Sequence, residues 1–556
     1  MAAQLKKLGY REVTVLEKTD RIGGKCFSVY LDAKGRPCQQ VRDSSTGEVD
    51  TASCVVHELG AILMSPLFRV SRELLREYGL KPTVARSQRS EAIRSNFTAP
   101  PVYLTVVQYA GLVVQSLVAQ GIIVPPQWLV SFFSPSLVPL WALIDEARRY
   151  NDLHRQLLGD YRWSLPQRPS ERILSTLSVS LEEFLLLNGF PLLREVFVWS
   201  FSSFGYGYLD TVSAYYGLAF IPPDLLNGFV QEAINSQLSE LFGQPRGSFS
   251  KAVRYFTKLL VGGDAGEVVS NKEVLPEGWG KIWTAMQEQD GLDVRLNVEI
   301  VKNGINRRLH DPEAPIKVVF KQGGRLSSAE FDILMYAAPH ALAGQYVRGL
   351  TSEERRIFGD LRPSTLMTTL YKGDAVPGYS TDPAEKVGYT DVTALSKGID
   401  GAWSSDVYSF PVHAEASPGD VGQARVSYQY YGRPCVSGEA LLCTAHFFPS
   451  TSSPWKVVVP RQAGRLLSEV GAAGGNNSVA VGQLPWPYFW RFTGQGVRKG
   501  LLWDLYDMQG RAKTYWIGAS AIFDSVEQVL DYNLLILQRH FGARVDRNGV
   551  VSRGRA

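Results

Sequence analysis

The N-terminal part of the chain contains an acidic residue and two adjacent glycines at a spacing that suits nucleotide binding. Glu17 ends an apolar run, and a carboxylate at the end of a buried strand accepts hydrogen bonds from ribose hydroxyls in dinucleotide-binding proteins. In segment 21–25, two glycines let the backbone approach a pyrophosphate and two flanking cations neutralise its charge. The alternative is an ordinary surface turn with incidental glycines. The residues with these expected roles are Glu17, Arg21, Gly23, Gly24 and Lys25.

The pattern around these residues predicts the elements that position them. Apolar residues within 2–8 repeat at helical spacing, and Gly9 follows as a helix stop. Residues 13–16 form an uninterrupted run of apolar and β-branched residues, which is typical of a parallel strand buried on both faces. The order helix, strand, acid is therefore that of a dinucleotide-binding unit.

The stretch VTVLEKTDRIGGKCFS resembles the FAD-dependent amine oxidase superfamily, from the end of its first helix to its second glycine motif. The resemblance implies an α/β fold in which an FAD-binding Rossmann-like domain is interleaved with an α+β substrate domain. In that superfamily a strand and a GxGxxG loop precede the helix, and this sequence has no counterpart of them. We therefore expect a complete protein that is longer by roughly twenty residues. The glycines near Gly494 have the wrong spacing to replace the GxGxxG loop, and an ordinary connecting loop is predicted there.

Three later segments resemble flavin-binding parts of the same superfamily. Residues 57–64 match a segment that packs against the flavin, and residues 294–300 match a strand whose backbone pairs with adenine. Residues 515–540 match the final strand, loop and helix, which lie at the ribityl chain and the pyrophosphate. No counterpart of the cysteine that binds flavin covalently in monoamine oxidases is present, so FAD is expected to be non-covalent. The contacts that the resemblance implies are those of Gly60, Ala61, Ile62, Val298, Gly518 and Val526.

These segments divide the chain into FAD-binding stretches and two insertions. The FAD-binding domain is expected in three parts, at 1–94, 267–350 and 485–556. A helical, apolar substrate or lid insertion is expected at 95–266, and an antiparallel-sheet substrate domain at 351–484. Alternating polar and apolar residues predict strands in the second insertion, at 424–431 and 441–448, and a loop at 472–478.

The first insertion begins with a tract that contains no charged residue, from Ser95 to Ile144. Within it, residues 103–123 are long enough to span a bilayer, but three glutamines interrupt them and two prolines follow. Three interpretations stay open: a transmembrane helix, an apolar lid or membrane-surface element, and buried helices of the substrate domain. Membrane-surface contact through 95–144 is therefore one expected interaction.

Aromatic residues are concentrated later in the same insertion. Residues 197–220 contain nine aromatic side chains, together with glycines that permit a tight bend. They form either an aromatic core or the wall of a substrate pocket beside the flavin, to which Phe204, Tyr206 and Tyr216 would contribute. Tyr206 is the candidate catalytic residue if a proton is removed, and core packing is its alternative role.

Composition excludes several classes of function. The chain has 58 basic and 54 acidic residues, a balance of +4 that is too weak for a nucleic-acid partner. Five cysteines and seven histidines show no metal-ligand spacing, so no metal site is expected. The odd cysteine count favours a reducing compartment such as the cytoplasm. Neither a GxSxG elbow nor a P-loop occurs, which disfavours nucleophilic hydrolysis.

The combined motifs resemble polyenoic fatty acid isomerases and beta-cyclopiazonate dehydrogenase more than amine oxidases proper. In those relatives the flavin abstracts a hydride from an apolar substrate, and the protein supplies positioning and exclusion of water. The resemblance implies an FAD-dependent oxidoreductase or redox-neutral isomerase acting on a small lipophilic substrate, fatty-acid-like or a secondary metabolite. Two alternatives stay open: a cofactor-less relic of the fold that acts as a binding or membrane-associated protein, and an amine oxidase for a small amine.

Overall fold

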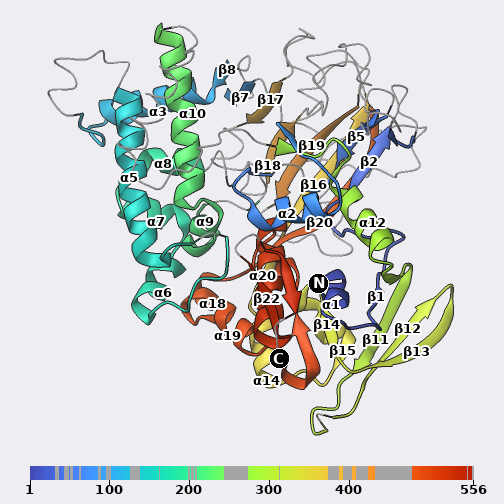
Figure 1. The fold of residues 1–556 in the computed structure, drawn as a ribbon. Helices are drawn as coiled ribbons and strands as arrows, with labels where there is room; N and C mark the ends of the chain where they lie inside the picture. The colour runs from blue at the N-terminus through green and yellow to red at the C-terminus, as the bar shows by residue number, and fades with distance from the viewer. Residues whose placement is uncertain are drawn as a thin grey trace, which may run out of the picture.

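The structure is a computed structural model of the 556-residue chain. It describes residues 1–31, 37–42, 49–50, 54–61, 64–84, 89–94, 102–125, 138–161, 163–197, 201, 206, 209–242, 273–311, 313–372, 387–391, 403–408, 424–431, 479–546 and 549–553. A group of helices lies on one side and the sheets on the other, with the C-terminal helices between them (Figure 1).

The helical side is built from the first insertion (Figure 1). Two of its short helices begin at serine N-caps, because the Ser170 and Ser180 side chains accept hydrogen bonds from backbone N–H groups in the first turn. Within the described residues, no helix is both long and apolar enough to cross a membrane. The helices are α3 (Val106–Ala119), α5 (Val138–Leu158), α6 (Glu171–Ser178), α7 (Leu181–Leu187), α8 (Pro191–Phe197), α9 (Ala214–Phe220) and α10 (Pro223–Phe242).

One glycine of the aromatic stretch lies inside a helix, where a bend was expected. Gly217 is in α9, and a Cβ atom there would lie 2.4 Å from the Leu181 methyl carbons. The glycine thus permits close packing of α9 on the start of α7.

A seven-stranded sheet forms the core of the second insertion, and all its pairings are antiparallel except that of β17 with β7. The strand predicted at 424–431 is confirmed, whereas 441–448 and 472–478 lie outside the described residues. The sheet also contains strands that precede residue 106 and one strand that extends beyond residue 484. The predicted domain boundaries remain predictions. In order across the sheet, the strands are β20 (Val479–Phe492), β16 (Leu361–Lys372), β19 (Ala424–Tyr431), β18 (Trp403–Tyr408), β17 (Val387–Asp391), β7 (Arg89–Arg94) and β8 (Val102–Thr105).

The segments expected to bind the nucleotide, called here the nucleotide side, contain two separate parallel strand pairs. In the described part of the chain, β1 (Thr14–Leu16) pairs with β10 (Asp293–Arg295), and β14 (Leu334–Tyr336) pairs with β21 (Thr514–Trp516). Helix α1 (Ala2–Lys7) precedes β1, as the sequence predicts. A four-stranded sheet lies beside them, in the order β13 (Arg325–Phe331), β12 (Ile316–Gln322), β11 (Val298–Asn306) and β15 (Val347–Arg348).

The remaining elements connect these units. The longer helices are α2 (Arg69–Glu77), α12 (Trp279–Gln289) and α20 (Val526–His540), the last with the predicted bounds. The short helices are α13 (Ala343–Tyr346), α14 (Ser352–Phe358), α18 (Gly494–Arg498), α19 (Leu501–Asp507), η3 (His340–Leu342), η5 (Arg511–Lys513) and η6 (Ala519–Ala521). The two-stranded pairs are β2 (Ser28–Leu31) with β5 (Val55–Glu58), β3 (Val41–Arg42) with β4 (Val49–Asp50), β6 (Thr83–Val84) with β9 (Glu273–Val274), and β22 (Ala543–Val545) with β23 (Val551–Arg553).

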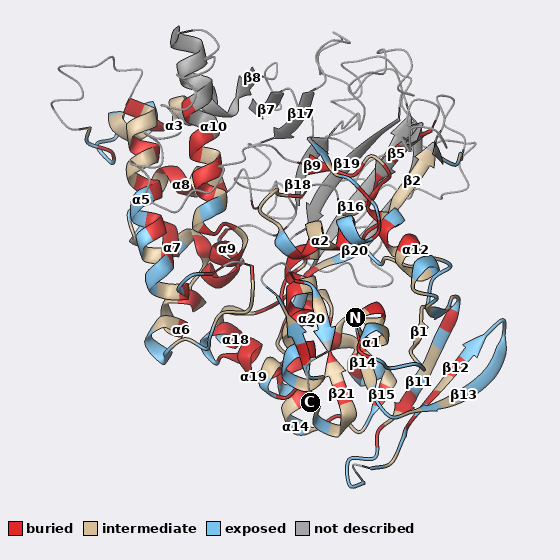
Figure 2. Cartoon of the chain, in the orientation of Figure 1, coloured by how far each residue is buried: buried red, intermediate tan, exposed pale blue. Residues whose placement is uncertain are grey.

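The buried residues form one main core that joins the helical insertion to the C-terminal segments (Figure 2). Tyr215 and Tyr216 from α9 lie in this core with Phe489 and Trp516, all at most 1% exposed. A second core lies around Trp279, between α2 and α12. Residues far apart in the sequence therefore share one interior, which fixes the insertions against the nucleotide side.

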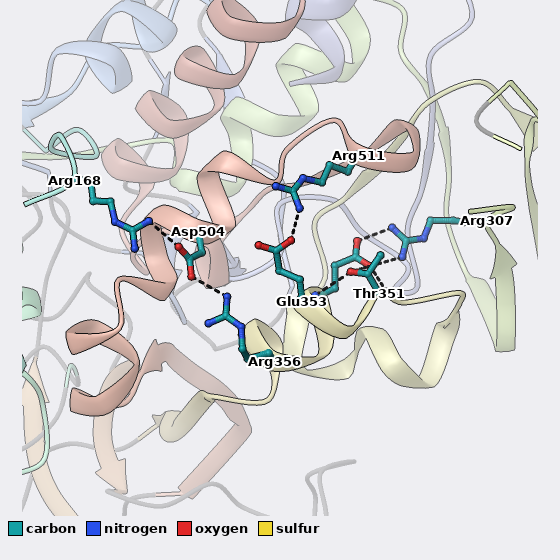
Figure 3. A network of polar contacts seen from close by, with 8 residues as sticks. Arg168, Arg307, Thr351, Glu353, Arg356, Asp504 and Arg511 are labelled. Atoms are coloured by element: carbon teal, nitrogen blue, oxygen red, sulfur yellow. Dashed lines mark hydrogen bonds and ion pairs between the residues drawn. The ribbon is translucent and has the colours of Figure 1, made fainter. Parts of the chain in front are cut away.

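Charged contacts add to the attachment of α14 (Figure 3). The Arg307 guanidinium binds both carboxylate oxygens of Glu354, at 2.7 and 2.8 Å, in a buried pair. On the exposed side, Asp504 accepts hydrogen bonds from Arg168 and Arg356, at 2.7 and 2.9 Å. These contacts tie α14 to strand β11, to α19 and to the segment before α6.

Two sequence-based expectations need correction. The segment at Gly494 is not a loop: it forms α18, because the Thr493 hydroxyl accepts a hydrogen bond from the Gly496 N–H and caps the helix. Cys38 and Cys54 form a disulfide, a pairing that the irregular cysteine spacing did not indicate. The disulfide weakens the argument for a reducing compartment, because that argument rested on unpaired cysteines. The compartment stays a prediction.

Candidate functional site

The two glycines after β1 adopt left-handed backbone conformations, and their surroundings differ. At Gly23, with φ +102°, a Cβ atom would lie 2.7 Å from the Trp283 ring. At Gly24, with φ +56°, a Cβ atom would meet nothing within 4 Å. Gly23 thus allows the loop to pack on α12, while Gly24 borders open space that a ligand can approach.

Glu17 lies at the end of β1, as expected for a ribose-binding carboxylate. Its Oε1 accepts hydrogen bonds of 2.8 Å from the Thr19 N–H and hydroxyl, and in the described structure its Oε2 accepts none. Its backbone carbonyl accepts a 2.9 Å bond from the Val298 N–H. The free carboxylate oxygen is available for ribose hydroxyls. The Val298 N–H, one of the backbone groups at the position expected to pair with adenine, is already used.

Lys25 lies in the segment 21–25 after β1, called here the glycine loop, and its side chain extends to the C-terminal part of the chain. Its ammonium forms an ion pair with Asp524, whose Oδ2 also accepts a 3.0 Å hydrogen bond from the Phe489 N–H. The same ammonium lies 5.2 Å from the centre of the Tyr488 ring. This lysine therefore joins the glycine loop to β20 and to the segment before α20.

Arg21 is held within its own loop. Its Nη2 donates to the Gly24 carbonyl at 2.8 Å, and its guanidinium lies 3.8 Å from the centre of the Phe27 ring. Burial lowers its pKa, although nearby carboxylates oppose this effect. Arg21 thus shapes the loop from which the pyrophosphate contact is expected, and its guanidinium already contacts the Gly24 carbonyl and the Phe27 ring.

The predicted flavin-contacting segment after β5 packs directly on the glycine loop. At Gly60 a Cβ atom would lie 1.6 Å from the Lys25 carbonyl oxygen, so no larger residue fits. The Ala61 N–H donates to the same oxygen at 3.0 Å. Ile62 lies outside the described residues.

Glu58, at the end of β5, caps a helix from a distant part of the sequence. Its carboxylate accepts hydrogen bonds from the Trp279 N–H at 2.6 Å and the Ser28 hydroxyl at 2.8 Å. Burial raises the pKa of Glu58 to about 8, although these two hydrogen bonds oppose the shift. The hydrogen bond to the Trp279 N–H fixes the start of α12 under the loop.

The C-terminal flavin segment also has the expected local structure. Gly518, with φ +89°, would place a Cβ atom 2.9 Å from the Ala337 carbonyl oxygen, so a glycine is required in the turn from β21 to η6. Val526 is the first residue of α20, whose N-cap Ser525 makes no side-chain capping bond. The next residue, Glu527, instead caps α2 by accepting bonds from the N–H groups of residues 69–71.

Tyr206 lies at the centre of a buried aromatic cluster. Its ring centre is 4.7 Å from that of Phe220, 4.9 Å from Phe523, 5.4 Å from Phe489 and 5.6 Å from Tyr488. These five residues, called here the aromatic cluster, come from three separate stretches of the sequence. The cluster adjoins the Lys25–Asp524 pair, because the Tyr206 hydroxyl donates to the Asp524 carbonyl at 3.3 Å.

The cluster does not provide a proton acceptor. Burial raises the pKa of Tyr206 well above its ordinary value, although its hydrogen bond with Tyr488 opposes the shift, so the phenol stays protonated at neutral pH. Tyr216 borders the cluster, with its ring centre 5.1 Å from that of Phe489, and its hydroxyl accepts a 2.8 Å bond from the Phe492 N–H. Phe204 lies outside the described residues.

In the described part of the chain, no three His, Cys, Asp or Glu side chains lie close enough together to hold a metal ion. His154 and His340 are buried singly, each with one ring nitrogen near a backbone carbonyl oxygen. Burial lowers the pKa of each to about 4, so both are neutral imidazoles of the core.

The residues at the glycine loop fit FAD, the cofactor that the sequence motifs imply. An available carboxylate oxygen on Glu17 suits the ribose hydroxyls, and the space beside Gly24 suits a pyrophosphate that approaches the backbone. Three other residues belong to this site and were not predicted from the sequence: Asp524, Phe489 and Glu58. Each acts through a partner from a distant segment, so no local spacing could identify them.

The family model described as flavin containing amine oxidoreductase matches residues 1–445. The fold resembles the CLA-producing fatty acid isomerase from P. acnes, with a TM-score of 0.58 and 17% identity over 97% of this chain and 96% of that chain. No curated protein sequence matches the chain.

The fold also resembles putrescine oxidase. A redesigned triple mutant gives a TM-score of 0.52 at 14% identity over 97% of this chain and 96% of that chain. The wild type bound to putrescine gives 0.51 at 15% identity over 95% and 93%. At these identities the similarity establishes the fold alone.

Proposed function

Because this chain belongs to the flavin-containing amine oxidoreductase family, it is an FAD-dependent enzyme, and we propose that its substrate is a small lipophilic molecule, fatty-acid-like or a secondary metabolite. We further propose that FAD is bound non-covalently, by the residues of the glycine loop, residues 60–62, Val298, Gly518 and Val526. Bound FAD supplies a hydride acceptor, and hydride abstraction from an apolar carbon leads either to oxidation or, when the hydride returns, to isomerisation.

The observation that carries the substrate proposal is the composition of the aromatic cluster. Its five rings are apolar surfaces, and the phenol of Tyr206 already donates its proton to a backbone carbonyl. The adjacent carboxylate, Asp524, is neutralised by Lys25 and so offers no free negative charge to a substrate ammonium. An apolar substrate is therefore better matched than a polyamine.

The chain's own residues then have defined roles. Glu17 accepts hydrogen bonds from the ribose, and Gly24 leaves room for the pyrophosphate. The Lys25–Asp524 pair keeps the glycine loop against the aromatic cluster. The cluster excludes water from the reacting carbon, which protects a hydride transfer from competing reactions.

The test uses the full chain, reconstituted with FAD and mixed anaerobically with either polyunsaturated fatty acids or a panel of small amines. We expect a fatty acid to bleach the flavin absorbance or to undergo a shift of its double bonds, detected by NMR. Bleaching by amines alone, with peroxide formed on admitting oxygen, would contradict the lipophilic substrate. Similarity of the fold to putrescine oxidase makes this amine panel the necessary comparison.

Tyr206→Phe separates the role of the ring from that of the hydroxyl. Because Tyr206 stays protonated and its ring supplies the apolar contact, we expect Tyr206→Phe to keep most of the activity and an unchanged pH profile. Tyr206→Ala opens the cluster and is expected to lower turnover strongly. Loss of a basic limb of the pH profile in Tyr206→Phe would show that the hydroxyl takes part in proton transfer.

A further inference from the structure

The end of helix α3 exposes apolar side chains in the charge-free tract. Val124 is 75% exposed and Ile122 is 54% exposed, shortly after the helix ends at Ala119. Ile123, between them, is 9% exposed and belongs to the main core. The two outward side chains are therefore held at the surface by an anchored neighbour.

Three backbone N–H groups in residues 121–125, the tip that follows α3, are paired by hydrogen bonds. The N–H groups of Gly121, Ile122 and Ile123 donate to carbonyls of α3, at 2.9, 2.9 and 3.2 Å. Each backbone group that enters an apolar medium unpaired raises the free energy of insertion, so these bonds lower its cost. The tip thus combines outward apolar side chains with three paired backbone N–H groups.

The helix itself is too short to cross a membrane. Its 14 residues span about 21 Å, less than the roughly 30 Å of a hydrocarbon core. Contact with a membrane would therefore be confined to the interface, with the end of α3 entering one leaflet.

Charge indicates which kind of surface fits. About ten charged residues would be expected in 50 positions at the chain's average of 20%, yet residues 95–144 contain none. Protein partners usually meet a polar, charged rim, and anionic lipids are recognised by lysine and arginine. Residues 121–125 carry no charged side chain, so the tip offers neither a charged rim nor a lysine or arginine for anionic headgroups.

We propose that the tip formed by residues 121–125 inserts into the interface of a neutral, zwitterionic phospholipid bilayer. This binding is independent of FAD and of the proposed substrate, and it places the enzyme where lipophilic molecules accumulate. It relies on apolar burial, so its strength does not depend on salt.

The experiment measures sedimentation of the full chain with phosphatidylcholine vesicles at low and high salt. The variant Ile122→Asp/Val124→Asp places two carboxylates at the tip and is expected to lower the partition coefficient tenfold or more. Leu187→Asp is the matched control, because Leu187 is 74% exposed on α7, outside the charge-free tract. Circular dichroism and thermal unfolding of each variant confirm that these surface changes leave the fold intact.

Salt-independent binding that the tip variant loses and Leu187→Asp retains would support the proposal. Three outcomes overturn it: no binding to phosphatidylcholine, binding only to vesicles that contain anionic lipid, or equal loss in Leu187→Asp. Self-association that only the tip variant abolishes, without vesicle binding, would assign the tip to a second copy of the chain. Failure of vesicle binding leaves the flavin assay unaffected, so the two proposals are tested separately.

Discussion

Lys25 and Asp524 form an ion pair that joins the glycine loop after β1 to the segment before α20. The two residues are 499 positions apart in the sequence. The Asp524 side chain is 9% exposed and that of Lys25 27% exposed, so the pair lies at the inner edge of the site.

Removing one member of this pair is expected to destabilise the protein. Lys25→Met leaves the buried Asp524 carboxylate without its cation, at a cost of about 2 kcal/mol in the free energy of unfolding. Adding Asp524→Asn to Lys25→Met relieves part of this cost. The double variant should therefore lose about 1 kcal/mol less unfolding free energy than the two single variants lose together. Urea unfolding of the four proteins of this cycle measures the coupling, and strict additivity would show that the pair contributes nothing.

Gly24→Ala is expected to weaken cofactor binding without unfolding the chain. The left-handed conformation costs an alanine about 1 kcal/mol, and no atom lies within 4 Å of the new methyl group. That methyl group would occupy the space assigned to the pyrophosphate, so the Kd for FAD should rise roughly tenfold or more.

Gly323→Ala is the matched control for that experiment. Gly323 has the same φ of +56° and equally open surroundings, but it lies in the turn between β12 and β13. Its alanine variant should lose similar stability and bind FAD normally. Equal FAD affinity in both variants, measured by fluorescence titration, would remove Gly24 from the cofactor site.

The buried Arg307–Glu354 pair is expected to be important for stability (Figure 3). The two side chains are 1% and 4% exposed, so Glu354→Gln leaves a buried guanidinium without its counter-charge. We expect a loss of about 3 to 5 kcal/mol in the free energy of unfolding. The exposed pair of Arg539 with Asp507 is the control, and Asp507→Asn should change stability by less than about 1 kcal/mol.

Glu58 should make stability depend on pH between its two pKa values. Its pKa is raised from 4.5 to about 8 in the folded protein, so the folded state keeps a proton that the unfolded state has lost. This contribution is complete below about pH 4.5 and is lost as the pH rises to about 8, with a slope of at most about 1.4 kcal/mol per pH unit.

Glu58→Gln removes the titrating group while keeping a hydrogen-bond acceptor for the Trp279 N–H. The difference in unfolding free energy between the wild type and this variant should therefore shift in favour of the variant as the pH rises. A difference that stays constant from pH 5 to pH 8 would show that Glu58 is ionised throughout.

Local sequence determined the elements that carry the cofactor contacts. An apolar run followed by Glu17 predicts β1 and its terminal carboxylate, because strand formation and strand end are local properties. The pair Gly23–Gly24 predicts a left-handed turn, and helix α20 has the predicted bounds Val526–His540. These features depend on residues that are neighbours in the chain.

Only the tertiary structure decided which distant groups complete them. Asp524 meets Lys25, Glu58 caps α12, and Glu527 caps α2, although each carboxylate lies in an element far from its partner in sequence. A carboxylate, a cation and a free helix start are compatible with many pairings in the unfolded chain. Packing of the shared core selects one set of partners, because it brings only those groups within hydrogen-bond distance of each buried carboxylate.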